Sequence, residues 1–230
     1  MTPAPHGNGA VEAPAGRGPI APAFRVVGAS VAEEAATPAL RFALEVDEAS
    51  GREVFTIALT AQIHVDPARR RYDADTRARL VDLFGEPERW PATTHSFLWT
   101  HATTLVPSFT GATACALTVP CSYDVELAAT KYLAGLDDGE VPLSFHFSGS
   151  VVHRGDDGAV QVVLVPWSCS AQWRLPVATW REMMARLYPH GGYARLHPHT
   201  VERLRERQVR RGAPSLDACI AELLDAEEAT

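Results

Sequence analysis

Apolar and polar residues alternate along most of the chain before residue 170, and the alternation is clearest from Thr113 to Ala129. In this stretch the odd positions are mostly apolar, whereas the even positions are mostly small or polar. Because successive side chains of a β-strand point to opposite faces, this period of two predicts a strand with one buried and one solvated face. Pro120 has no backbone N–H, so we expect a bulge or a sheet edge there and two shorter strands instead of one.

The same alternation recurs in stretches separated by turn residues. Residues 39–47 and 55–65 flank a turn and are predicted to form a hairpin, with Phe55 pointing into the core. Further strands are expected at residues 24–31, 95–106, 141–152 and 159–167. In the strand at 95–106, three large apolar residues are expected on one face: Phe97, Trp99 and Leu105.

Helical periodicity appears in two regions. Residues 73–85 predict a short helix that begins at an Asp73 or Asp75 cap and ends at Gly85. After Leu175 the period changes to that of amphipathic helices, and Pro198 fits the first position of one of them.

The chain as a whole therefore predicts an α+β fold. We expect a curved antiparallel β-sheet or open β-sandwich of about seven or eight strands, with C-terminal helices packed on it. These helices fall within about residues 175–225, inside a single domain that spans residues 24–230. Residues 1–23 are rich in proline, glycine and alanine without any periodicity, which is typical of a disordered tail.

Composition and charge narrow the possible partners. The formal net charge is −7, which argues against non-specific binding to nucleic acid. No apolar run reaches the roughly 18 residues that a membrane-spanning helix needs. The first residues lack the features of a secretory signal, and four scattered cysteines suit reduced thiols. We therefore expect a cytoplasmic protein with neither a nucleic-acid nor a membrane partner.

Polar residues on the strand faces opposite the core form the first candidate site. They are Thr60, Gln62, His64, Asp124, Glu126, Ser144, His146 and Ser148. If these strands are neighbours, Asp124, Glu126 and His146 share one surface, where a carboxylate beside a histidine could bind a ligand or transfer protons. An antiparallel sheet with one solvated face has the same pattern, and this is the simpler interpretation.

Metal binding and catalysis have weaker signals. His190, His197 and His199 lie in one short segment and are candidate metal ligands, but no further ligand has diagnostic spacing. The chain contains no nucleophile elbow, phosphate-binding loop or dinucleotide fingerprint. We therefore expect no cofactor and a non-enzymatic protein, with an enzyme or metal-handling protein that uses the His/carboxylate face as the alternative.

An arginine-rich helix is the best candidate for a partner surface. Between Arg195 and Arg211 the chain holds six arginines and two glutamates, a local net charge of +4 in an acidic protein. Arg203, Arg207 and Arg210 could therefore contact an acidic partner or a phosphate. A solvated helix with internal ion pairs would look similar.

The sequence also resembles an uncharacterised family common in actinobacteria. The resemblance lies in VPCSYDVELAATKYLAGLDDGEVPLSFHFSGSVV, followed by VPW and RLPVATWREMM, and in the earlier RRRYDADTRARLVDLFG and FLWT. It covers about residues 24–224 and assigns no catalytic residues. Members are often encoded near uptake nickel–iron hydrogenase genes, which implies an accessory or maturation role with a hydrogenase subunit or maturation factor as partner.

Overall fold

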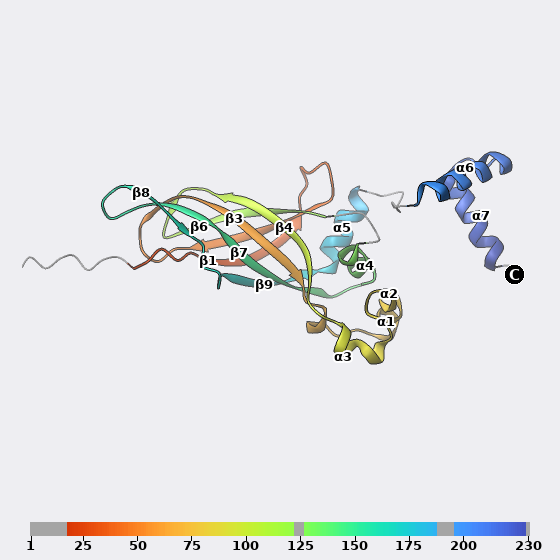
Figure 1. The fold of residues 1–230 in the computed structure, drawn as a ribbon, viewed down its shortest axis with the longest axis horizontal. Coiled ribbons are helices and arrows are strands. Elements are labelled where there is room, and N and C mark those ends of the chain that lie inside the picture. The colour runs from red at the N-terminus through yellow and green to blue at the C-terminus, as the bar shows by residue number, and fades with distance from the viewer. Residues whose placement is uncertain (1–17, 122–126, 188–195, 229–230) are drawn as a thin grey trace, which may run out of the picture.

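The computed structural model describes residues 18–121, 127–187 and 196–228. In this part of the chain nine strands form two antiparallel sheets, and helices gather at one end of the long body that the sheets make (Figure 1). The predicted α+β fold is confirmed, in the form of an open sandwich.

The smaller sheet has the strand order β1–β2–β6. Its strands are β1 (Ala23–Val31), β2 (Ala39–Asp47) and β6 (Ala112–Pro120). In the larger sheet the order is β4–β3–β7, with β5 also paired to β3 and with β8 and β9 paired to successive parts of β7. Its strands are β3 (Glu53–Val65), β4 (Phe97–Val106), β5 (Phe109–Thr110), β7 (Glu140–Arg154), β8 (Val160–Leu164) and β9 (Ser170–Pro176).

The two sheets face each other and approach along both edges. β4 lies beside β6 and β1 beside β9, and the Thr104 hydroxyl donates a hydrogen bond to the Ala116 carbonyl at 2.9 Å. Between the sheets, Phe42 of β2 meets Phe145 of β7 edge-on, with ring centroids 5.2 Å apart. The alternation read from the sequence therefore places one face of each sheet in a shared core.

At two β-bulges, large apolar residues point to the face opposite to the one that the sequence predicts. The pairing of β3 with β7 shifts between Val54 and Thr56, so Phe55 leaves the core and lies half-exposed under the Arg154 guanidinium, 5.0 Å away. A second shift, between β3 and β4, makes Trp99 the extra residue. Because one extra residue reverses the side-chain faces beyond it, Leu105 points outward and is 70% exposed.

A helical insert connects β3 to β4. Its elements are η1 (Pro67–Arg69), α1 (Ala74–Arg79), α2 (Val81–Phe84), η2 (Pro87–Arg89) and α3 (Trp90–Thr93). The predicted cap and stop of the helix are both present: the Asp73 carboxylate accepts a hydrogen bond from the Thr76 N–H at 2.7 Å, and Gly85 has φ 76°. Helix α4 (Ala128–Ala134) then precedes β7.

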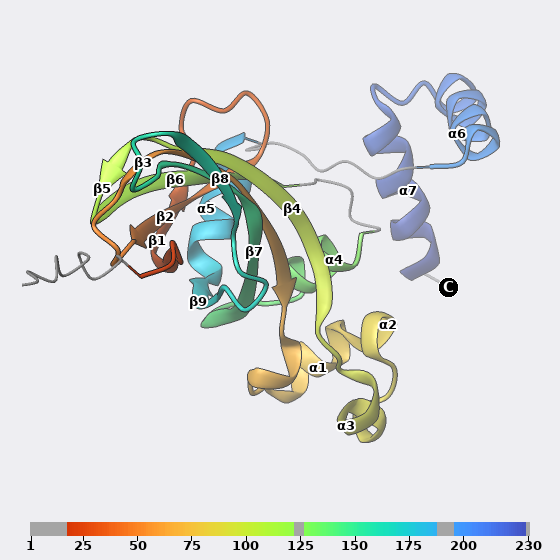
Figure 2. The same ribbon diagram turned by 60° about the vertical axis from the view of Figure 1, so that its left-hand side comes forward.

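The C-terminal helices differ in what they contact. Helix α5 (Val177–Leu187) packs on β1, β2 and β9 and buries Val177, Trp180 and Met183. Helices α6 (Pro198–Arg211) and α7 (Leu216–Glu228) pack on each other, and Figures 1 and 2 show this hairpin standing away from the sheets. Among the described helices, none combines the length and the apolar character that crossing a membrane requires.

Candidate functional site

The outer face of the larger sheet brings several predicted polar residues together. Strands β3, β7 and β9 are neighbours, and residues directly opposite in an antiparallel pair share a face. Three rows cross this face: His64–Ser144–Gln172, Gln62–His146–Ser170, and Thr60–Ser148. Because the rows lie on successive outward positions, these residues form one continuous surface, which we call the polar face.

Histidines from adjacent strands meet on the polar face. The rings of His64 and His146 are edge-on with centroids 5.5 Å apart, and His101 of β4 lies opposite Gln62. Partial burial lowers the pKa of His64, and the positive charges that His146 and His101 can carry lower it further, against the opposing effect of Asp66. Within the described ranges, no three His, Cys, Asp or Glu side chains are placed to hold a metal ion.

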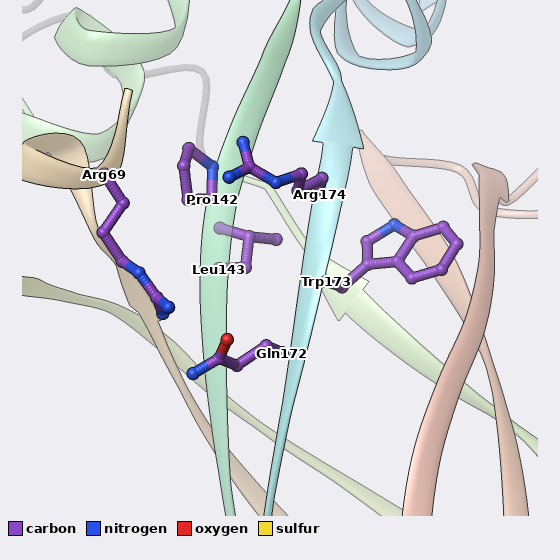
Figure 3. A pocket seen from close by; sticks show the side chains of 6 residues that line it. All are labelled: Arg69, Pro142, Leu143, Gln172, Trp173 and Arg174. Atoms are coloured by element: carbon purple, nitrogen blue, oxygen red, sulfur yellow. The ribbon is translucent and has the colours of Figure 1, made fainter. Parts of the chain in front are cut away.

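A pocket of about 350 Å³ opens at the end of the polar face nearest the helical insert (Figure 3). It is lined by Arg69, Pro142, Leu143, Gln172, Trp173 and Arg174. At its rim Asp66 is largely buried and accepts a hydrogen bond from the Ser144 hydroxyl. Arg174 lies opposite Pro142, so β9 places its guanidinium on the same side of the sheet as Gln172.

Burial disfavours the reactive form of three of the four cysteines. All four are free, and burial raises the pKa of Cys115 and Cys169 and raises that of Cys121 to about 12. Since a thiolate is the reactive form of cysteine, these three thiols are poor nucleophiles. The polar face and its pocket are therefore equipped for hydrogen bonding and charge recognition.

The remaining predicted residues lie elsewhere. Arg203 and Arg210 are exposed on α6, Arg207 is half-buried there, and His197 and His199 are exposed at the start of the same helix. Asp124, Glu126 and His190 lie outside the described residues.

Sequence reasoning missed the residues that complete the pocket. Arg69 sits in a 3₁₀ turn directly after the strand break at Asp66, and Gln172 and Arg174 belong to β9, which was not predicted. A signal for β9 was present, because Ala171, Trp173 and Leu175 alternate with polar residues. The following helical periodicity obscured this short run.

The fold and its surfaces define an α+β sandwich protein with a polar outer face and an appended helical hairpin. The chain belongs to a family of unknown function (DUF6084), whose profile matches residues 20–230. No curated protein matches the chain.

Solved structures show only distant similarity. One is a late embryogenesis abundant (LEA) protein, with 12% identity, a TM-score of 0.29, and coverage of 67% of this chain and 70% of that one. A β-glucosidase from Kluyveromyces marxianus has 6% identity and a TM-score of 0.25, over 67% of this chain and 15% of the enzyme. An ApaA protein from Bordetella pertussis has 9% identity and a TM-score of 0.23, over 68% and 94%. No conclusion on function follows from similarities at this level.

Proposed function

We propose that this protein is a non-enzymatic accessory protein that binds another protein through the α6–α7 hairpin. The exposure of the hairpin is the observation that carries the proposal: α6 buries no residue, and α7 buries only Cys219. Its exposed apolar side chains are Val209, Ile220, Leu223 and Leu224. Ile220, Leu223 and Leu224 share one face of α7 by their spacing, and an exposed apolar patch of this kind is typical of protein–protein contact sites.

The charges on the hairpin indicate the chemistry of the partner. Helix α6 carries five arginines and two glutamates, and in the described residues none of these arginines forms an ion pair. On one side of α6, Val209 is 82% exposed and lines a shallow groove together with Glu202, Arg205, Glu206 and Arg210. Because guanidinium groups bind carboxylates with two parallel hydrogen bonds, an apolar protein surface rimmed by acidic residues would suit this groove.

The family supplies a candidate partner. The resemblance to an actinobacterial family encoded near uptake nickel–iron hydrogenase genes supports a role in assembly or maturation of such an enzyme, with a hydrogenase subunit or maturation factor bound to the hairpin. We expect this to occur in the cytoplasm, where the free cysteines would stay reduced.

Affinity purification of the tagged full-length chain from its native host tests the proposal. Replacing Arg203, Arg207 and Arg210 together by glutamate should abolish capture of the partner. A matched control replaces three exposed arginines of the helical insert, Arg71, Arg77 and Arg89, by glutamate and should capture it normally. Recovery of the protein by itself, without a hydrogenase subunit or maturation factor, would refute the hydrogenase role, and unchanged capture by the α6 variant would exclude the hairpin as the contact.

The contact between His64 and His146 is the one observation that favours the alternative, an enzyme or metal-handling protein that uses the polar face. Elemental analysis of the purified protein separates the two functions. Stoichiometric nickel, iron or zinc that is lost on replacing both histidines by glutamine would favour metal handling and would contradict the proposal of a metal-free accessory protein.

A further inference from the structure

We propose that the pocket beside the polar face is a binding site for a small anion, held through its phosphoryl or carboxylate group by Arg69 and Arg174. This inference does not rest on the α6–α7 hairpin, because the pocket is built from η1, β7 and β9.

Donor groups from two separate elements converge on the pocket. Figure 3 shows the guanidinium group of Arg174 and the amide of Gln172 extended over β7, and the Arg69 guanidinium beside β7 on the side of the insert. Arg69 comes from the insert, whereas Gln172 and Arg174 come from successive outward positions of β9. A guanidinium group has only donors, so a ligand shared by two of them must supply acceptors, which the oxygens of a phosphoryl or carboxylate group do.

Both arginines have unused hydrogen-bonding capacity. Arg174 forms no hydrogen bond or ion pair with any described residue. Arg69 forms an ion pair with Asp66, but the 3.8 Å between Nη1 of Arg69 and Oδ2 of Asp66 is too long for a hydrogen bond. That same oxygen accepts the Ser144 hydroxyl, so the one acidic group at the rim is already engaged.

The local charge is opposite to that of the whole protein. The chain carries a formal net charge of −7, yet the pocket lining contains two cationic side chains and no acidic one. Cationic side chains that face each other across a cavity repel unless an anion lies between them. This lining favours an anion over a metal cation.

The rest of the lining limits the size of the anion. Of the three apolar lining residues, only Pro142 shares a face with the donors, because Leu143 and Trp173 occupy strand positions that point to the core. A cavity of about 350 Å³ lies at the lower end of the range for small-molecule sites. A small anion whose oxygens reach both guanidinium groups therefore fits the pocket, and Pro142 offers only a small apolar surface to any organic body that the anion carries.

Isothermal titration calorimetry of the full-length protein at constant ionic strength tests the site. The probes are phenyl phosphate and phenylacetate as the two organic anions, and inorganic phosphate as the anion without a body. We expect saturable binding of at least one of the three probes, and comparison of the two organic anions identifies the preferred anionic group. Arg69→Gln and Arg174→Gln should each weaken binding at least tenfold, because each removes a charged hydrogen bond.

Two controls keep the test decisive. Arg71→Gln changes an exposed arginine that does not line the pocket and should bind like the original protein. The α6 variant with glutamate at positions 203, 207 and 210 should also bind normally, so that failure of the hairpin contact and failure of this site give different results. Absence of saturation with all three probes, or equal weakening by Arg71→Gln, would overturn the proposal. Circular dichroism confirms that each variant is folded.

Discussion

Gly149 provides the sharpest test of how closely the two central strands of the larger sheet approach. It lies in β7 opposite Leu59 of β3, at the point where β7 passes from pairing with β9 to pairing with β8. Its φ is +146°, a backbone conformation that side-chain-bearing residues rarely adopt. A Cβ added there would lie 2.0 Å from the Ala58 carbonyl oxygen.

The cost of Gly149→Ala follows from these two features. Backbone strain at such a φ costs about 1–3 kcal/mol for a residue other than glycine. Ordinary contact begins at 3.4 Å, so the strands must also separate by roughly 1.4 Å, and overpacking of this kind adds about 1–3 kcal/mol. We therefore expect a loss of about 4 kcal/mol in the free energy of unfolding, a large part of the stability of a typical domain.

Urea unfolding followed by tryptophan fluorescence measures this loss. Gly158→Ala is the matched control, because Gly158 also has a positive φ, +80°, but an added Cβ would meet no atom within 4 Å. The control should lose only about 1–2 kcal/mol. If the free energies of unfolding of the two variants differ by less than about 1 kcal/mol, β3 and β7 do not approach each other this closely at Gly149.

Two further predictions concern protonation and a buried hydroxyl pair. The pKa of His64 is lowered in the folded protein, so as the pH falls the unfolded chain takes up a proton at a higher pH than the folded protein does. The stability that neutral His64 contributes should therefore be full above pH 6.5 and decline as the pH falls below it. His64→Gln should make the pH dependence of the unfolding midpoint shallower. An unchanged slope would contradict the lowered pKa of His64. Tyr132, fully buried, shares a 2.7 Å hydrogen bond with the Tyr72 hydroxyl, which donates in turn to the Pro67 carbonyl. Tyr132→Phe should cost about 1 kcal/mol in urea unfolding, and a stabilised variant would show that the pair is not formed.

The alternation of apolar residues predicted the strands well, because it reports burial on one face and needs no knowledge of neighbours. It failed where the chain departs from strict pairing. The bulge at Trp99 turns Leu105 outward, and no local feature of the sequence marks that extra residue. Strand order is equally hidden: Gln62 and His146 are 84 positions apart, and only the pairing of β3 with β7 makes them neighbours. The polar face could therefore be proposed from the sequence as a set of outward residues, but its convergence could not.

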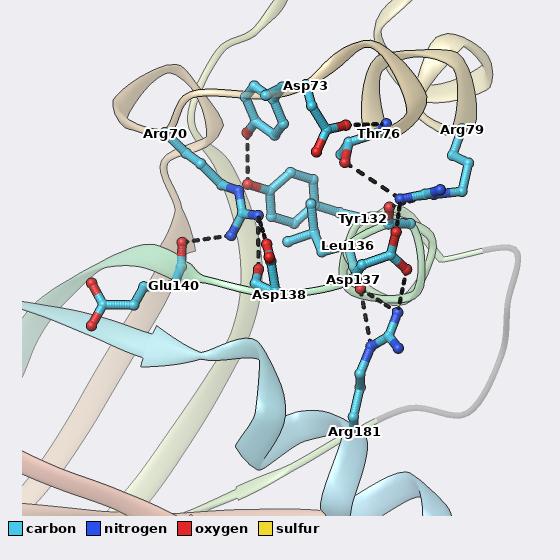
Figure 4. A network of polar contacts seen from close by, with 12 residues as sticks. Arg70, Asp73, Thr76, Arg79, Tyr132, Leu136, Asp137, Asp138, Glu140 and Arg181 are labelled. Atoms are coloured by element: carbon cyan, nitrogen blue, oxygen red, sulfur yellow. Dashed lines mark hydrogen bonds and ion pairs between the residues drawn. The ribbon is translucent and has the colours of Figure 1, made fainter.

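The pocket shows why an insert that looks like a simple connection matters for the site. Arg69 reaches the polar face only because the insert folds back against the start of β7. Figure 4 shows how it is held there: the Arg70 guanidinium donates to the carbonyl groups of Asp138 and Glu140, at 2.8 and 2.9 Å. Asp137 accepts from Arg79 of α1 and from Arg181 of α5, so the same turn ties the insert to the C-terminal part of the domain.

These contacts mainly fix the position of the backbone around Arg69. The Arg70 side chain is only 11% exposed, and its partners are backbone carbonyls with fixed positions. The neighbouring Arg69 is therefore anchored at its backbone, while its own guanidinium remains half in solvent beside the pocket. A loose surface arginine would lose much conformational freedom on binding an anion, whereas one whose backbone is already fixed loses less. The contacts between insert and β7 thus favour a pocket whose cationic wall is in place before a ligand arrives.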